Sequence, residues 1–271
     1  LVINLPNLLN HCYHQPMPPT PEFLSLPYSL VDLHSIHTNH PEDDGLSPVW
    51  HMVASAHEQG IIPALNGHNT LKDAPEFINA VKHYFGSRDL ALVGTEISFT
   101  TQADPETINL YLNQLPSAQA LPYHHPTKFT GELVCLMPPQ LHLIKKMDTL
   151  VSSWRDRKLN QTQGLADFFT FLQSSDTRLT SSEWDQLLFH LPHPLTNETH
   201  LLGRFFNRLG MGPNILIPTE IFTDSTVCNQ LHTIEIFNAT LPLISNQAAL
   251  ELANLPEFQH LHITSASDSH F

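Results

Sequence analysis

The sequence predicts an α/β fold in which a parallel sheet, or a barrel made from one, is surrounded by helices. Short apolar runs alternate with amphipathic segments of helical period, which is the pattern of repeated β-α units. The chain has 271 residues, enough for one large α/β domain or two small ones. Histidine and acidic residues recur where the apolar runs end. Because the carboxyl ends of barrel strands build the active site, these residues predict one shared site.

In the first part of the chain, each expected strand is followed by a helix with a clear start and stop. One helix is expected between Ser47 and Gly60, with Pro48 at its first position. A second is expected between Asp73 and Gly86, with an apolar stripe on one face. The strands expected in this part are 30–33, 61–65 and 90–93.

The same alternation returns in the last third of the chain. Apolar runs again precede segments of helical period, and Pro256 limits the last helix. The elements expected here are strands at 186–191, 232–237 and 261–264, and helices at 201–210 and 245–254.

The remaining segments define the domain organisation. Residues 1–29 are rich in proline and predict an arm, so the barrel is expected to span 30–271. The segment at about 138–182 carries two amphipathic faces, at 143–154 and 165–172, and predicts a helical insertion over one side of the barrel. The alternative is that these are ordinary barrel helices that follow a poorly marked strand.

Composition excludes some function classes. The net charge of −14 disfavours a long nucleic-acid footprint made of Lys and Arg. No run approaches the roughly 20 apolar residues of a membrane segment. The three cysteines, Cys12, Cys135 and Cys228, are far apart and lack metal-site spacing, which predicts a reducing compartment such as the cytoplasm. Export and protein partners are left open.

The residues that carry chemistry are histidines and carboxylates near strand ends. Asp32 lies in the first expected strand, His34 and His37 follow it, and Asp268 and His270 follow the last. Neutral imidazole and carboxylate are ligands of divalent first-row metals, and ligands from many strand ends indicate one shared site. The sequence therefore predicts a metallohydrolase, with Asp32 placed to orient His34.

The order of these motifs resembles the PHP (polymerase and histidinol phosphatase) family of metal-dependent phosphoesterases. The resemblance covers about residues 30–271, and 233–238 also looks like the corresponding part of such proteins. The segments that carry it are Asp32–Thr38 with Asp43–Gly45, Asn66–Thr70, Gly94–Ser98, His193-Pro194 and Ser267–His270.

This resemblance implies a distorted, TIM-like (β/α)7 barrel that holds two or three divalent ions, which could be Mn, Zn, Fe or Mg. It implies hydrolysis of phosphate esters by a metal-activated water held by the cluster, with Asp268 and His270 at the reacting centre. Arg155 and Arg157 of the insertion are candidates for contact with a substrate phosphate, although a solvated helix face also accounts for them. The metal ligands that the resemblance implies are His34, His37, Asp44, His68, Glu96, His193, Asp268 and His270.

The chain departs from the family pattern at four places. The segment from His37 to Asp44 is longer than usual, so His40, Glu42 or Asp43 could take a ligand role. Asn66-Gly67-His68 stands where the family prefers Thr-Asp-His. Two residues separate His34 from His37 where the family usually has one, and an extra residue turns the next side chain to the other face of a strand unless a bulge absorbs it. Asn109 stands where the family supplies a further histidine, and His124 or His125 is a possible substitute.

Three functions are compatible with these features. The first is hydrolysis of a small or terminal phosphate, on a nucleotide, a sugar phosphate or an oligonucleotide end. The second is a non-catalytic binding or regulatory module that retains some ligands, which the altered first motif and Asn109 favour. The third, hydrolysis of carbon–nitrogen bonds, ranks last because the lysine or histidine arrangement of such enzymes is not evident in the sequence.

Overall fold

The fold is described from a computed structural model of the chain. The structure describes residues 30–38, 45–101, 105–119, 129–158, 164–174, 179–197, 215–216 and 220–268. The predicted arm at 1–29 and the helix expected at 201–210 lie outside the described residues.

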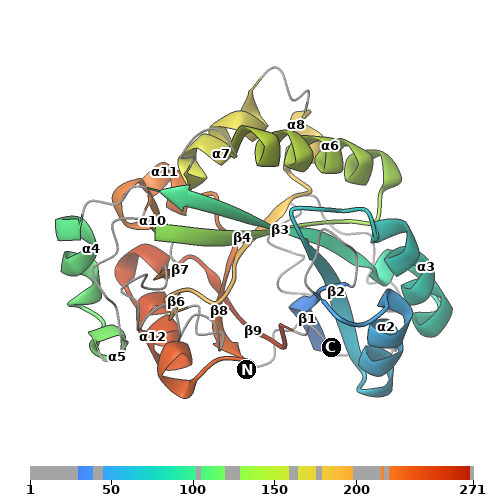
Figure 1. The fold of residues 1–271 in the computed structure, drawn as a ribbon, viewed down its shortest axis with the longest axis horizontal. Coiled ribbons are helices and arrows are strands. Elements are labelled where there is room, and N and C mark those ends of the chain that lie inside the picture. Colours follow the sequence, from blue (N-terminus) through green and yellow to red (C-terminus); the bar gives the residue numbers. More distant parts are fainter. Residues whose placement is uncertain are drawn as a thin grey trace.

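Seven strands form a sheet that is almost closed into a barrel, with helices around the outside (Figure 1). The strands follow one another in the order β1-β2-β3-β4-β5-β8-β9, while the short strands β6 and β7 pair with each other and β7 also pairs with β4. The α/β barrel predicted from the sequence is therefore confirmed. The strands are β1 (Leu30–Ile36), β2 (Ile61–His68), β3 (Leu92–Thr101), β4 (Phe129–Met137), β5 (Leu188–Leu191), β6 (Thr196–Asn197), β7 (Ile215–Leu216), β8 (Thr233–Asn238) and β9 (His262–Ala266).

Hydrogen bonds between the end of β9 and β1 bring the two outer strands of this sheet together. The N–H of Asp268 donates to the carbonyl of His34 at 2.9 Å. The N–H of Ser267 donates to one carboxylate oxygen of Asp32 at 3.0 Å, and the N–H of His34 donates to the other at 3.2 Å. Burial raises the pKa of this Asp32 carboxyl to about 6. Asp32 therefore orients the segments that carry the ligands through their backbone.

Strand β4 runs antiparallel to both of its neighbours, β3 and β5, whereas β1-β2-β3 and β5-β8-β9 are parallel. No strand was expected at this position from the sequence. Residues 133–137 are all buried, and a short run that is apolar on both faces has no alternation to mark it as a strand. The helices expected at 138–182 are thus present. The poorly marked strand of the alternative interpretation is present as well, and it precedes them.

The helices pack their apolar faces against the strands. The two faces predicted at 143–154 and 165–172 are buried on α6 and α7, which lie over β3 and β4 in Figure 1. Trp154 and Phe168 join these helices, with 5.1 Å between their ring centroids. The α-helices are α2 (Val49–Glu58), α3 (Ala74–Phe85), α4 (Pro105–Leu112), α5 (Pro116–Gln119), α6 (Leu141–Lys158), α7 (Leu165–Gln173), α8 (Ser181–Trp184), α10 (Glu220–Thr223), α11 (Ser225–Cys228) and α12 (Leu243–Ala253), and the 3-10 helices are η2 (Arg88–Leu90) and η4 (Pro256–Phe258).

Most predicted elements of the described residues are confirmed within a few positions. Helix α3 ends at Gly86, whose φ of 81° lies in the left-handed region that favours glycine at a helix C-cap. Helix α2 begins at Val49, after Pro48, one residue later than predicted. Strand β1 is longer than expected and continues to Ile36.

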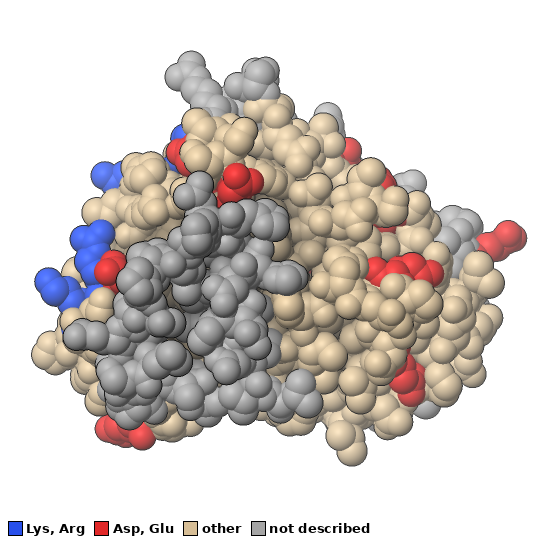
Figure 2. Space-filling view, turned by 180° about the vertical axis from the view of Figure 1, so that it is seen from behind, with Lys and Arg blue, Asp and Glu red and all other residues tan. Residues whose placement is uncertain are grey.

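Among the described residues, no helix is both long enough and apolar enough to cross a bilayer. On the face turned away from the view of Figure 1, acidic side chains are spread among uncharged ones and basic side chains lie toward one edge (Figure 2).

Replacement of Gly94 by alanine tests the packing of β3 between β2 and β4. An added Cβ would lie 2.6 Å from a methyl group of Leu136 and 2.9 Å from the carbonyl oxygen of Cys135. We expect Gly94→Ala to lower the free energy of unfolding by about 1–3 kcal/mol, as overpacking of a core does, measured by urea denaturation. Ser153→Ala on the exposed face of α6 is the control, with an expected change within about 0.5 kcal/mol. Equal stability of the two variants would contradict this packing.

Candidate metal centre

The candidate metal centre lies inside the barrel, where side chains from β1, β2, β3 and the segments after β1, β5 and β9 converge. These side chains form groups of three whose ligand atoms lie within 4.8 Å of one another. The residues that sequence analysis predicted and that the structure brings together are His34, His37, His68, Glu96, His193 and Asp268.

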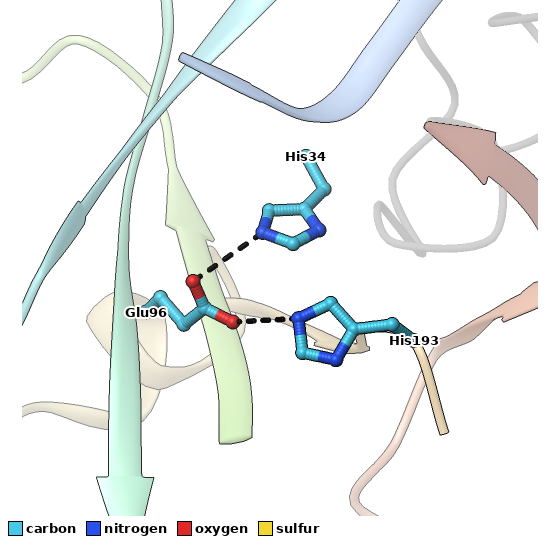
Figure 3. A group of neighbouring side chains, drawn as sticks. All are labelled: His34, Glu96 and His193. Carbon is cyan, nitrogen blue, oxygen red and sulfur yellow. Dashed lines mark hydrogen bonds and ion pairs between the residues drawn. The ribbon is translucent and has the colours of Figure 1, made fainter. Parts of the chain in front are cut away.

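Glu96 of β3 is the residue that the imidazoles share. Its Oε2 atom lies 3.3 Å from His34 Nε2 and 3.6 Å from both His37 Nε2 and His68 Nδ1. Its Oε1 atom lies 3.2 Å from His193 Nε2, so His34 and His193 contact different oxygens of one carboxylate (Figure 3). Glu96 is therefore buried with imidazoles on both of its carboxylate oxygens.

Asp268 completes the cluster from the end of β9. Its Oδ1 atom lies 3.4 Å from His37 Nε2 and 3.6 Å from His34 Nε2. Its Oδ2 atom accepts from Asn238 Nδ2 at 3.0 Å and from Thr240 Oγ1 at 3.3 Å. The backbone φ of 48° is left-handed, a conformation that aspartate adopts more readily than most residues. Partners on one oxygen and the turned backbone together direct the other oxygen toward the imidazoles.

A bulge in β1 explains how His34 and His37 both reach the cluster. Asp32 pairs with Pro63 and Ile36 pairs with Leu65, so four steps along β1 match two along β2. This register shift departs from regular strand alternation, so side chains three positions apart can lie toward the same cluster. The two Nε2 atoms of His34 and His37 consequently face each other at 3.3 Å.

Glu132 is a site residue that sequence analysis missed. It lies on β4, opposite Ser98 of β3, and its Oε2 atom is 3.5 Å from His193 Nε2. Because β4 is antiparallel, the residue that reaches the site comes from its first half and not from its end. Asn109, by contrast, is exposed on α4. A prediction of β4 as a strand would have been needed to find Glu132.

His190 and Glu235 were also missed, and both are buried beside His34. Glu235 Oε2 lies 3.1 Å from His34 Nδ1 and 3.4 Å from His190 Nε2. Burial opposes ionisation of Glu235, but hydrogen bonds from His190 and His34 outweigh it and lower its pKa to about 2. Burial also lowers the pKa of His190. Alternation along β8 puts Glu235 on the same face as Thr233, but it does not distinguish a site residue from a buried structural one.

The other predicted site residues are not placed in the cluster. Asp44, His125 and His270 lie outside the described residues, as does the side chain of Arg157. Arg155 is partly exposed on α6 and lies 4.0 Å from Asp156 in an ion pair. The roles assigned to these residues from the sequence stay predictions.

The electrostatics of the cluster fit cations. Burial disfavours charge on His34, but Glu96 and Asp268 outweigh it and raise the pKa of His34 well above its usual value. Burial likewise opposes a charge on His193, yet Glu96 and Glu132 raise its pKa to about 9. The pKa values of Glu96 and Asp268 lie well below the usual range, because the effect of the imidazoles exceeds that of burial. The carboxylates therefore stay ionised and attract positive charge, which either protons or divalent ions can supply.

The side chains of the cluster are also of the chemical types that bind divalent metal ions. Neutral imidazole and carboxylate bind Zn, Mn and Fe, and a structural zinc site needs about four ligands. The groups described above supply such donors, so these His, Glu and Asp residues could hold metal.

Comparisons with known proteins do not identify a family for this chain. No protein-family model and no curated protein matches the sequence. A solved structure with some similarity is an amidohydrolase from Chromobacterium violaceum, with bound sulfate and no metal. It has a TM-score of 0.42 and 14% sequence identity, over 89% of this chain and 87% of that one. So low a similarity carries no information about chemistry, and the PHP resemblance stays a prediction from the motifs.

Asp268→Asn should reduce the amount of metal that the protein holds. Asparagine keeps the size of the side chain and tolerates the left-handed backbone, but it removes the charge that faces His34 and His37. We expect fewer ions per chain than in the wild type, measured by plasma mass spectrometry after loading with Mn or Zn and dialysis. Asp89→Asn in the exposed η2 helix is the control. The same ion content in Asp268→Asn and the wild type would contradict a ligand role.

Metal affinity should fall as the pH is lowered. An imidazole must be neutral to bind metal, so below the pKa of about 9 for His193 an incoming ion must displace a proton. For each proton displaced, we expect the Kd for Zn to rise about tenfold per pH unit of acidification. Competition with a chromophoric chelator at two pH values measures this. A Kd independent of pH would show that these imidazoles do not bind the ion.

Proposed function

We propose that the protein is a metal-dependent hydrolase of phosphate esters that acts on a small or terminal phosphate. The observation that carries this proposal is the position of Glu96, whose two oxygens face different groups of imidazoles. Such a shared carboxylate supports a centre of two or more ions. Centres of this kind stabilise both the attacking and the leaving oxygen of a phosphate ester.

The residues around Glu96 divide into candidate ligand groups. His34 and His193 lie on its two oxygens, with Glu132 next to His193. His37 and His68 lie near Oε2. Asp268 contacts the same nitrogens of His34 and His37 from another direction.

When bound, divalent ions would polarise the phosphoryl group and lower the pKa of a water molecule. The chain itself fixes the positions of the donors. Asn238 and Thr240 hold Asp268, and the backbone of β9 is bonded to that of β1. These contacts limit the motion of Asp268 and His34. They therefore lower the free-energy cost of arranging these side chains during the reaction.

The difference in exposure among the candidate ligands indicates from which side a substrate could reach them. The side chain of His68 is 23% exposed, whereas those of His34, His37 and Glu96 are buried. We infer that the substrate phosphate arrives on the side of His68. With a net charge of −14, the chain is better suited to a nucleotide, a sugar phosphate or an oligonucleotide end than to a long polymer.

We also infer a reducing compartment, the cytoplasm, for this activity. Cys135 and Cys228 are buried free thiols, which supports the location that the cysteine pattern predicts.

A phosphate-release assay on the wild type and Glu96→Gln tests the function. We expect Mn- or Zn-dependent release of phosphate from p-nitrophenyl phosphate or nucleoside monophosphates. Because Glu96 is shared among the ligands, Glu96→Gln should lower kcat/KM by about 1000-fold. Glu58→Gln, an exposed change of the same kind on α2, should retain activity.

Other results of the assay would overturn the proposal. Cleavage of amides without cleavage of phosphate esters would indicate a carbon–nitrogen hydrolase. No metal-dependent turnover, together with at most one bound ion, would indicate a non-catalytic module.

A further inference from the structure

A buried set of polar side chains lies on the side of His34 opposite to Glu96. His34 Nε2 faces Glu96 at 3.3 Å, while its Nδ1 atom lies 3.1 Å from Glu235 Oε2. The two nitrogens of an imidazole ring point in different directions, so Glu235 contacts the ring from behind the candidate metal centre.

Glu235 is itself held by residues of two strands. His190 Nε2 lies 3.4 Å from the same Oε2 atom, and His190 Nδ1 lies 2.8 Å from Thr233 Oγ1. Thr233 and Glu235 share one face of β8, and His190 of β5 pairs directly with Thr233. All of these side chains are buried, so water does not compete for their hydrogen bonds.

These contacts determine the positions of the protons. An ionised carboxylate only accepts hydrogen bonds, so His34 Nδ1 and His190 Nε2 must both donate to Glu235. The Nδ1 atom of His190 then accepts from the hydroxyl of Thr233. With one proton held on Nδ1, His34 directs Nε2 at Glu96, His37 and Asp268, where either a second proton or a divalent ion can occupy its lone pair.

We propose that Glu235, supported by His190 and Thr233, is the positioning residue that holds His34 as an Nδ1–H tautomer with Nε2 directed at the metal centre. The inference rests on the proposed metal centre and assigns Glu235 a place behind it. A carboxylate that accepts from the second nitrogen of a ligand histidine fixes the ring and makes the binding nitrogen more basic. Its loss costs about 10–100-fold in metal affinity.

The structure offers one competing role for the same residues. His34, His190 and Glu235 also form a group that could hold an ion directly, in which case the ion would bind His34 at Nδ1. The two roles predict different metal-bound nitrogens, so a spectroscopic measurement distinguishes them.

The first experiment loads histidine-labelled (¹⁵N) protein with ¹¹³Cd and measures cadmium–nitrogen coupling by NMR. We expect coupling to Nε2 of His34 and a retained Nδ1–H, assigned by loss of the signal in His34→Gln. Coupling to Nδ1 of His34 would overturn the inference and make Glu235 a direct ligand.

The second experiment measures the Kd for Zn in Glu235→Gln. Glutamine keeps the shape but loses the charge that requires a donor on His34, so we expect a 10–100-fold weaker Kd and a mixture of His34 tautomers. Glu58→Gln on the exposed end of α2 is the matched control, and Glu235→Asp should restore part of the affinity. A purely structural role would change unfolding but leave the tautomer of His34 unchanged.

The outcomes separate this inference from the proposed function. Wild-type affinity and an unchanged tautomer in Glu235→Gln would overturn the inference, even if the protein hydrolyses phosphate esters. Zinc binding that depends on Glu235, in a protein that cleaves no ester, would overturn only the proposed function.

Discussion

Closure of the sheet between β9 and β1 is the constraint on which the candidate metal centre depends. The N–H of Asp268 donates to the carbonyl of His34, so the same hydrogen bond joins the two strands and brings two candidate ligands together. Asp32 reinforces the join because its carboxylate accepts from the backbone of both segments. The barrel and the site therefore form together, and a change that opens this edge of the sheet would separate Asp268 from the imidazoles.

The charges inside the barrel are arranged in two layers around His34. In one layer Glu96 and Asp268 face the Nε2 nitrogen, and in the other Glu235 faces the Nδ1 nitrogen. Buried carboxylates this close together are costly unless positive charge or hydrogen-bond donors compensate for them. In the first layer divalent ions would meet that need, and in the second the N–H groups of two histidines already do.

The sequence was sufficient for the parallel parts of the barrel and for the ligands that follow parallel strands. His34, His68, Glu96, His193 and Asp268 each lie in or just after a strand whose apolar run and flanking helix are well marked. Glu132 could not be found in this way, because its strand is apolar on both faces and runs in the opposite direction. His190 and Glu235 lie within strands, where a buried polar residue has no local pattern that separates it from a structural one. Their role depends on pairing between β5 and β8, which only the folded chain shows.

The bulge in β1 has a consequence for how such sites diverge. Since four residues of β1 span the distance of two residues of β2, the strand accommodates a change in the length of the first motif without moving its two imidazoles out of the cluster. Although two residues separate His34 from His37, both imidazoles lie in one cluster. A search that allows only one residue between the two histidines would therefore miss this pair.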